Sequence, residues 1–318
     1  MKLVTFKSGG RPRLGALKEG AVIDMALAAQ DHNATLPDDI LALLLLGDGG
    51  LEACREVIEV ADPAAPYAQA IESAELLAPV PKPTSVRDGY AFRQHVKTAR
   101  ANRGAEMIPE FDEFPVFYFT NHHAIFGPGP VKVMPRHLDR LDFELECAIV
   151  IGREGRNIPA SEADQHIAGY MVMNDLSARA LQMQEMKLSL GPAKGKDFAT
   201  TLGPWLVTKD ELESKRIEGA DGDRYDLKMT ATVNGVQTSE DSLKNMTWTF
   251  AQIIERASYG VQLQPGDVIG SGTCGTGCFL ELNGSGITDN QWLEEGDTVE
   301  LTIEGLGTLS NTIAVWRE

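Results

Sequence analysis

The sequence of 318 residues is short of cysteine, of cationic side chains and of long apolar runs. Its four cysteines show no paired spacing typical of metal ligands, which favours reduced thiols in a cytoplasmic protein. Twenty-nine Lys and Arg against 46 Asp and Glu give a net charge of −17, so nucleic acid and anionic lipid would be repelled. The apolar run 40–46 is too short to span a membrane, and residues 1–6 lack a signal-peptide pattern. We therefore expect a cytoplasmic protein with no nucleic-acid or membrane partner.

A proline-rich stretch, 79–83, interrupts all periodicity and predicts a domain boundary. The boundary separates a small amino-terminal domain, 1–78, from a larger domain, 79–318. The first part shows short strand patterns followed by helical ones: strands at 2–6, 14–17 and 21–25, and helices at 37–46, 51–60 and 67–77.

The larger domain is rich in predicted strands. They lie at 144–151, 168–173, 227–233, 267–269, 279–282, 299–303 and 312–316. Asn234-Gly235 is a hairpin signal, and 248–259 has the apolar stripe of a helix. This order of elements predicts an α+β, mostly β fold, with a mixed β-sandwich roll as the larger domain.

Acidic side chains alternate along the most apolar of these strands. Asp142, Glu144 and Glu146 are spaced by two, so their side chains share one face, and Asp175 follows another apolar run. Buried carboxylates are costly unless a proton or a cation neutralises them. An all-oxygen donor set suits Mg²⁺, Mn²⁺ or Ca²⁺ better than zinc. The pattern therefore indicates a site for a hard divalent cation.

Other polar groups are open to two readings. Residues 270–275 match the dinucleotide pattern G-x-G-x-x-G, but 277–282 reads as a strand where that pattern needs a helix. A glycine-rich loop that approaches another group closely is the better interpretation. His95 alone is more often a surface or core residue, and Lys196 is either an active-site cation or a loop lysine. For Arg100 and Arg103, a solvated helix face is the better interpretation from the residues alone.

Several blocks of sequence, taken in order, resemble the fumarylacetoacetase family. They are Asp88 with Arg93-Gln94-His95, Phe143-Glu144-Leu145-Glu146, Met173-Asn174-Asp175-Leu176-Ser177-Ala178-Arg179, Gly195-Lys196, Thr201, Pro204-Trp205 and Ser271-Gly272-Thr273. The resemblance covers the larger domain, and the small domain is similar to that of short bacterial members. It implies a small-molecule oxo-acid substrate and a homodimer formed through the larger domain.

The resemblance also implies roles for individual residues. The metal ligands for Mg²⁺, Ca²⁺ or Mn²⁺ would be Asp88, Glu144, Glu146 and Asp175. The catalytic groups would be His95 with Glu281 for water activation, and Arg179, Gln182 and Lys196 around the oxyanion. The substrate contacts would be Thr273 and, for the distal acid group, Tyr90, Tyr118 and Arg100 or Arg103.

The resemblance implies a hydrolase that cleaves a carbon–carbon bond in a 1,3-dioxo acid, such as fumarylacetoacetate or an acylpyruvate. Acylpyruvase-like members of the family pair this histidine with a glutamate a few residues later, but residues 96–99 contain no acid. The resemblance to the fumarylacetoacetase branch therefore implies Glu281, on an expected strand near the end of the chain, as the partner of His95. Oxaloacetate-type decarboxylation and hydration or isomerisation of an unsaturated 2-oxo acid are alternatives on the same metal site. A metal-stabilised scaffold or a nucleotide-dependent enzyme fits these residues less well.

Overall fold

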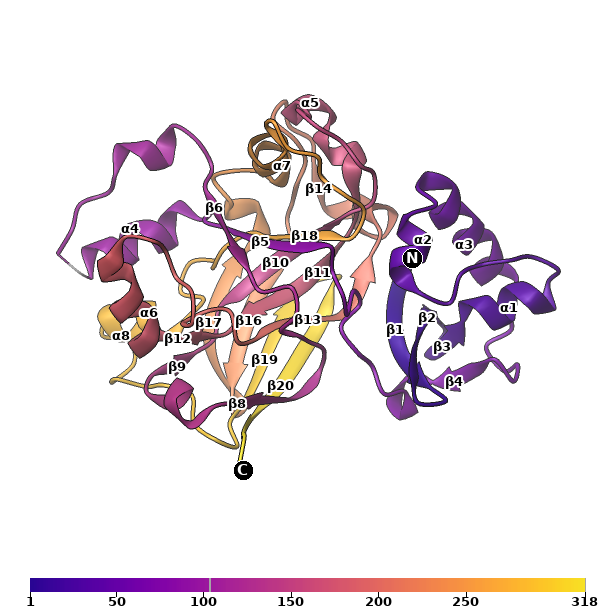
Figure 1. The fold of residues 1–318 in the computed structure, drawn as a ribbon, viewed down its shortest axis with the longest axis horizontal. Helices are drawn as coiled ribbons and strands as arrows, with labels where there is room; N and C mark the ends of the chain where they lie inside the picture. Colours follow the sequence, from indigo (N-terminus) through magenta and orange to yellow (C-terminus); the bar gives the residue numbers. More distant parts are fainter. Residues whose placement is uncertain (103, 318) are drawn as a thin grey trace.

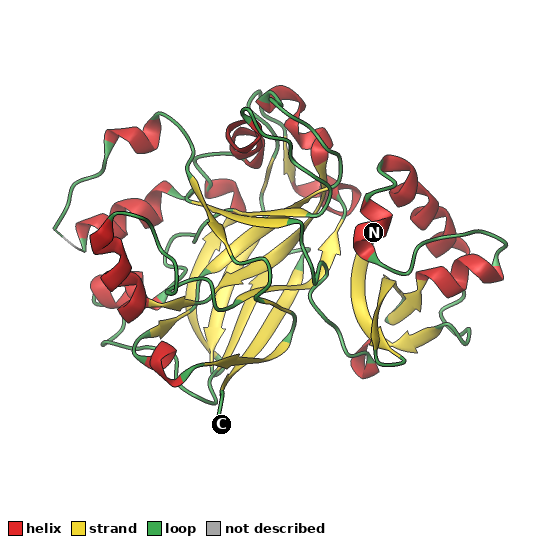
Figure 2. Cartoon of the chain, viewed as in Figure 1, coloured by secondary structure: helices red, strands yellow, loops and turns green. Residues whose placement is uncertain are grey.

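The computed structural model describes residues 1–102 and 104–317. In these residues two sheets form the main layers, and helices lie around their ends (Figures 1 and 2). The larger sheet runs, in spatial order, through β4 (Ala68–Ala70), β3 (Ala21–Asp24), β2 (Arg11–Lys18), β1 (Lys2–Ser8), β13 (Thr200–Val207), β11 (Ile167–Asp175), β10 (Leu145–Ile151), β18 (Asp267–Gly270), β5 (Ser85–Gly89) and β6 (Phe117–Thr120), with β7 (Ile125–Phe126) beside β13.

The second sheet has five strands in the described residues. Their order is β17 (Val236–Ser242), β16 (Lys228–Val233), β19 (Thr298–Ile303), β20 (Gly307–Val315) and β8 (Gly129–Val133). Two small pairs are β9 (Leu141–Asp142) with β12 (Ser177–Ala178), and β14 (Arg216–Ile217) with β15 (Arg224–Tyr225). Most pairings are antiparallel, but β18 runs parallel to β5, β7 to β13 and β8 to β20.

The helices are short. The α-helices are α1 (Met25–Asp31), α2 (Ile40–Leu44), α3 (Asp48–Val60), α4 (Arg93–Ala101), α5 (Ala160–Ala163), α6 (Arg179–Glu185), α7 (Phe250–Ser258) and α8 (Phe279–Gly284). The 3₁₀ turns are η1 (Ile71–Ser73), η2 (Pro109–Asp112), η3 (Pro135–Leu138), η4 (Asp164–His166), η5 (Met186–Leu188), η6 (Lys209–Lys215) and η7 (Leu243–Asn245). No helix of the described ranges is both long and apolar enough to cross a bilayer.

The mostly β architecture agrees with the predicted fold class. The first four strands, with α1–α3, form the amino-terminal part to the right of Figure 1, and their sheet continues into the larger layer where β1 pairs with β13. The predicted boundary falls between η1 and β5. The hairpin at Asn234-Gly235 joins β16 to β17, and both residues have positive φ. This backbone is the one a tight two-residue hairpin requires.

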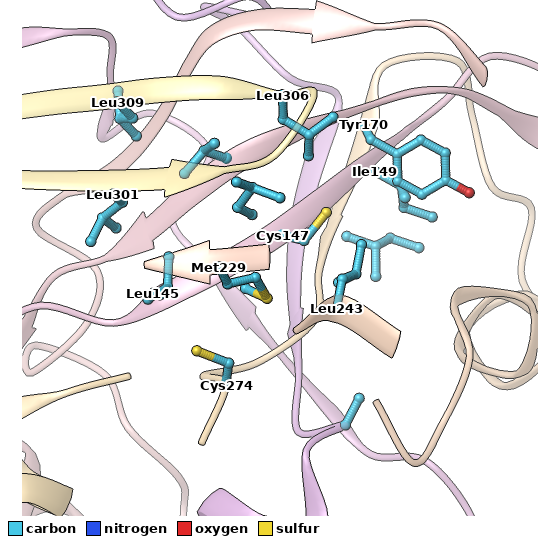
Figure 3. Close-up of a cluster of buried hydrophobic side chains, with 14 of the residues drawn as sticks. Leu145, Cys147, Ile149, Tyr170, Met229, Leu243, Cys274, Leu301, Leu306 and Leu309 are labelled. Carbon is cyan, nitrogen blue, oxygen red and sulfur yellow. The ribbon is translucent and has the colours of Figure 1, made fainter. Parts of the chain in front are cut away.

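Strand β10 is buried on both faces. Its side chains point alternately into two different hydrophobic cores. Leu145, Cys147 and Ile149 point into the core between the two sheets, which Figure 3 shows with Tyr170, Met229 and other apolar side chains. Ala148 and Val150 point to the opposite side, into the core shared with the amino-terminal part. Because side chains alternate, Glu146 also belongs to this second side. The sandwich core therefore fixes the strand that carries the acidic residues.

Two predicted elements are wrong. Residues 67–77, predicted as a helix, form β4 and η1 instead, because β4 pairs with the edge of β3 and tertiary pairing overrides helix propensity. Residues 279–282, predicted as a strand, begin α8. The carboxylate of Asp142 accepts hydrogen bonds from the backbone N–H groups of Phe279 (2.7 Å) and Leu280 (3.0 Å). A carboxylate 137 positions away in sequence thus accepts hydrogen bonds from backbone N–H groups that have no partner within the helix.

Candidate metal centre and active site

Four buried carboxyl groups meet at the ends of three strands of the large sheet, β5, β10 and β11. Asp88 lies on β5, Glu146 on β10, Glu144 just before β10, and Asp175 at the end of β11. One oxygen from each lies within 4.8 Å of the other three. The structure therefore brings together all four residues that sequence resemblance suggested as metal ligands.

Two cationic side chains lie against this carboxyl cluster. Lys196 donates to Glu144 and, at 2.7 Å, to Asp175. Arg179 donates at 2.8 Å to Glu144 and at 2.8 Å to Asp142. Five buried carboxyls thus face two cations, so the site keeps an excess of negative charge unless protons or another cation are bound.

The pKa values of the carboxyls follow this charge imbalance. Burial, and then the nearby Asp175 carboxylate, raises the pKa of Asp88 to about 8. Burial and the charge of Asp88 raise the pKa of Glu146 well above its usual range. Burial acts in the same direction on Glu144, but the charges of Lys196 and Arg179 outweigh it and lower that pKa to about 2. Asp88 and Glu146 are therefore the two carboxyl groups whose ionised form is least compensated by the nearby cations.

Unpartnered oxygens and a missing side chain show that the cluster fits a cation. Among the described residues, Glu146 Oε1 and Asp175 Oδ1 are buried and accept no hydrogen bond. A Cβ at Gly270 would contact Asp88 Oδ1 and would lie 3.0 Å from Glu146 Oε2, so glycine keeps this space open. Four carboxylates form the donor set of a hard divalent ion such as Mg²⁺, Mn²⁺ or Ca²⁺.

Asp142, the rival ligand on the same strand face, lies outside the cluster. Its carboxylate accepts from Arg179 and from the N–H groups that open α8. Burial raises its pKa, although the charge of Arg179 opposes the shift. Its oxygens are therefore already engaged, which makes Asp142 a structural partner of the cluster.

The glycine-rich loop after β18 serves the carboxyls. Gly272 N–H lies 3.2 Å from Asp88 Oδ1 and 3.1 Å from Glu146 Oε2. A short helix, α8, does follow the loop, contrary to the predicted strand. The N–H group that a phosphate would need nevertheless points at two carboxyl oxygens. The loop is thus one that approaches another group closely, as the sequence favoured.

His95 and Glu281 meet across the site although 186 positions separate them. His95 lies on α4, and Glu281 lies in the first turn of α8 and not on the strand we expected. His95 Nδ1 is 2.7 Å from Glu281 Oε2, and both side chains are buried. Asn102, at the end of α4, reinforces this meeting, because its amide donates to the Glu281 backbone carbonyl at 3.2 Å.

A pocket of about 440 Å³ opens onto this site. Its polar lining contains residues from every predicted group: Asp88, Tyr90, His95, Arg100, Tyr118, Glu144, Arg179, Gln182, Lys196 and Thr273. Its apolar lining comprises Val96, Ala99, Ile108, Val116, Phe117, Met183, Met186, Pro192 and Leu280. The pocket therefore offers both ionic and apolar contacts to a bound molecule.

The remaining predicted site residues differ in the hydrogen bonds that they already make within the protein. Arg179 is used by three side-chain partners, since it also donates to Gln182 Oε1 at 3.0 Å. The Gln182 carbonyl is thereby occupied, so its amide nitrogen is the end available to the pocket. Tyr118 donates to Asp175. Arg100 donates to the Glu106 carbonyl at 2.5 Å. Arg103 lies outside the described residues.

Glu185, which the sequence gave no reason to select, anchors the loop that carries Lys196. Its carboxylate accepts from three successive backbone N–H groups, those of Ala193 (2.9 Å), Lys194 (2.8 Å) and Gly195 (3.0 Å). These hydrogen bonds outweigh the effect of burial and lower the pKa of Glu185. A glutamate several residues before a Gly-Lys pair was the available signal, but it is not distinctive without the fold.

These observations define a candidate acidic metal centre with a histidine–glutamate pair, set on a two-layered β fold. The family model described as "Fumarylacetoacetate (FAA) hydrolase C-terminal" matches residues 84–314. The chain belongs to this enzyme family.

Known relatives extend over nearly the whole chain. Oxaloacetate tautomerase YisK of Bacillus subtilis is 30% identical, over 88% of this chain and 87% of its own length. The mitochondrial oxaloacetate tautomerase FAHD2A of Homo sapiens is 30% identical, over 98% of this chain and 91% of its own length. A solved fumarylacetoacetate hydrolase from the psychrophilic Exiguobacterium antarcticum superimposes with a TM-score of 0.74 at 26% identity, over 99% of this chain and 100% of that chain. The family thus includes both tautomerases and hydrolases.

Removal of one carboxylate should abolish cation binding. In wild-type protein, Mg²⁺ at about 100 times its Kd should add about 2.7 kcal/mol to the free energy of unfolding. Asp175→Asn should lose this gain, and the metal-dependent activity with it. Asp164→Asn is the matched control, because burial also raises the pKa of Asp164 but this residue lies outside the cluster. Thermal unfolding with Mg²⁺ or with chelator measures the difference, and an equal gain in Asp175→Asn would refute the site.

The stabilisation by Mg²⁺ should depend on pH. The folded-state pKa values of Asp88 and Glu146 lie above those of the unfolded chain, so their contribution to stability is present at low pH. It is lost as pH rises through the folded pKa, about 8 for Asp88. A cation binds the ionised carboxylates and offsets this loss. The gain in Tm from Mg²⁺ should therefore be larger at about pH 8 than at about pH 6, and a gain independent of pH would contradict this account.

Loss of the Glu185 anchor should reduce turnover without removing the metal centre. A displacement of Lys196 by about 1 Å can cost up to about a hundredfold in rate. Glu185→Ala should lower kcat strongly, and Glu185→Gln, which keeps one acceptor oxygen, should lie between it and the wild type. Gln184→Ala, at the exposed neighbouring position, is the control. The gain in Tm from Mg²⁺ should persist in all three variants, and normal kcat in Glu185→Ala would contradict the role.

Proposed function

We propose that this protein is a metal-dependent hydrolase that cleaves a carbon–carbon bond in a 1,3-dioxo acid, such as fumarylacetoacetate or an acylpyruvate. The observation that carries the proposal is the contact between His95 and Glu281 at the wall of the carboxyl-lined pocket. Hydrolysis needs a base for water beside a site that binds the dioxo group, and this arrangement supplies both.

The cluster of Asp88, Glu144, Glu146 and Asp175 would hold the divalent cation. Bound there, the cation would polarise the carbonyl under attack and offset the charge of the enolate leaving group. Mg²⁺, Mn²⁺ and Ca²⁺ all suit these four carboxylates.

The histidine–glutamate pair would activate the water. Glu281 holds His95 through Nδ1, which directs the other ring nitrogen, Nε2, to proton transfer. Glu281 fixes the ring orientation and stabilises the imidazolium that forms when the water gives up its proton. His95 can then return that proton to the carbon that leaves. Buried surroundings strengthen the interaction between the two side chains.

Donors at the pocket floor would stabilise the oxygen that becomes negative. Gln182 lines the pocket, and because its carbonyl oxygen accepts from Arg179, its amide nitrogen would be the donor. Lys196 keeps one further N–H beyond those given to Glu144 and Asp175. Each well-placed donor of this kind is worth about 2.7–4 kcal/mol in related catalysis. Arg100 and the apolar side chains of the pocket lining would receive the distal acyl part of the substrate.

Tautomerisation of oxaloacetate is a second candidate, favoured by the names of the relatives that match along most of the chain. It needs a base that moves a proton between carbon and oxygen, and His95 has the chemistry for that step. The two reactions differ in the fate of water. A hydrolase inserts a solvent oxygen into a product carboxylate, whereas a tautomerase exchanges substrate C–H with solvent.

Isotope labelling separates these candidates. Incubation with acylpyruvates, fumarylacetoacetate analogues and oxaloacetate in ¹⁸O-water should give one labelled carboxylic acid from a dioxo acid. Parallel reactions in deuterium oxide measure exchange at the carbon beside the carbonyl of oxaloacetate. Deuterium exchange with no labelled cleavage product from any dioxo acid would replace the hydrolase by the tautomerase.

The histidine–glutamate pair should act as one unit. Glu281→Gln should retain Mg²⁺ binding and lower kcat by about a hundredfold or more. His95→Ala should be slower still, and the double variant should be little slower than His95→Ala alone. Steady-state kinetics at saturating Mg²⁺ provide the comparison. Losses that multiply in the double variant would show that the two side chains act separately.

We also propose a homodimer formed through the larger domain. Strand β6 is an edge of the large sheet, and its Phe119 is 62% exposed beside the active-site pocket residues Phe117 and Tyr118. Exposed edges and apolar side chains of this kind call for cover. Light scattering at micromolar concentration should give twice the chain mass, and a monomer would reject the proposal.

A further inference from the structure

A third donor side chain lies beside the histidine–glutamate pair and has no part in the proposed reaction. Cys278 is the extended residue that directly precedes α8, and Glu281 lies in the first turn of that helix, three positions further on. Cys278, Glu281 and His95 are all buried, and one ligand atom of each lies within 4.8 Å of the other two.

This second group differs chemically from the carboxyl cluster. Thiolate, imidazole and carboxylate together are a typical donor set for zinc, whereas four carboxylates suit harder cations. Zinc sites with three protein ligands leave a fourth position for water or substrate.

The present geometry is close to what zinc needs. Zinc bonds of about 2.0–2.3 Å place two tetrahedral ligand atoms about 3.3–3.7 Å apart. The 2.7 Å contact between His95 and Glu281 would have to open slightly, and the thiol would have to approach. Both helices involved are tied together by Asn102, which donates to the Glu281 carbonyl at 3.2 Å and to Ser285 Oγ at 3.4 Å. The required changes are side-chain movements, with the thiol proton released to solvent.

We propose that His95, Cys278 and Glu281 form a second cation site, which binds Zn²⁺ and similar thiophilic divalent ions and inhibits the enzyme. Zinc bound there takes the imidazole and the carboxylate away from proton transfer. The carboxyl cluster keeps its own hard cation meanwhile, so excess Mg²⁺ does not relieve the inhibition. Zinc binding does not depend on the proposed hydrolase function, whereas inhibition by zinc rests on it.

Binding can be measured without any substrate. Protein saturated with Mg²⁺ should take up one equivalent of Zn²⁺ in equilibrium dialysis. Cys278→Ser should bind Zn²⁺ more weakly by at least the roughly 10- to 100-fold that loss of an outer-shell partner costs. Cys274→Ser is the matched control, since Cys274 is equally buried but lies outside the group of three. Co²⁺ in place of Zn²⁺ should give a thiolate-to-cobalt charge-transfer band in wild type and Cys274→Ser, and none in Cys278→Ser.

Inhibition completes the test. With Mg²⁺ in excess, Zn²⁺ should inhibit the wild type, and a zinc chelator should restore activity. The activity of each protein is expressed relative to its own rate without zinc. The Zn²⁺ concentration that halves this activity should rise in Cys278→Ser by the same factor as the dissociation constant for Zn²⁺. Equal zinc sensitivity in Cys278→Ser would place the inhibitory ion at the carboxyl cluster and overturn the proposal. A wild-type cobalt complex without a thiolate band would overturn it too, whatever the folding of the variants.

Discussion

Uncompensated negative charge in the interior is the constraint on which this structure depends. Among the described residues, the carboxyl groups buried at the ends of β5, β10 and β11 form ion pairs with two cationic side chains, Lys196 and Arg179. Charges removed from water are tolerated when they are paired, protonated or bound to a metal. Two of the oxygens, on Glu146 and Asp175, still lack a hydrogen-bond partner among the described residues. A hard divalent cation accounts for both the charge and the vacant oxygens.

The rest of the site is arranged around this charge. Gly270 leaves space beside the carboxyls, and the N–H of Gly272 is directed toward them. Asp142 connects the carboxyl cluster to the His95–Glu281 pair, because its carboxylate accepts from Arg179 and from the first N–H groups of α8. The helix that carries Glu281 is thus held by the same ionic network that surrounds the carboxyl cluster. The sandwich core behind β10 keeps this network in place.

Such a centre supports more than one reaction, which agrees with the variety of named activities among the relatives. Carboxylate ligands stabilise an enolate equally in hydrolysis, decarboxylation and tautomerisation, so they do not choose among them. The choice depends on what the pocket holds above the metal and on how the base is placed. In this chain the proposed base, His95, is paired with a buried glutamate, and apolar side chains make up much of the pocket lining.

The sequence by itself determined the mostly β fold, most strands, the hairpin at Asn234-Gly235 and the face shared by Glu144 and Glu146. These features follow from periodicity and turn chemistry, which act over a few residues. The ligand set and the pairing of His95 with Glu281 came from a family resemblance, because local pattern cannot measure distances across the chain.

Only the tertiary structure decided the features that depend on distant partners. Residues 279–282 form a helix because the carboxylate of Asp142 satisfies its first N–H groups, and 67–77 gives up its helical pattern to pair with β3. Asp142 is a structural partner and no ligand because the same fold gives it Arg179. Glu185 and Cys278 gain meaning only beside groups that the fold brings to them. Local sequence sets the backbone's preferences, but the energy of a buried charge is fixed by whatever surrounds it in space.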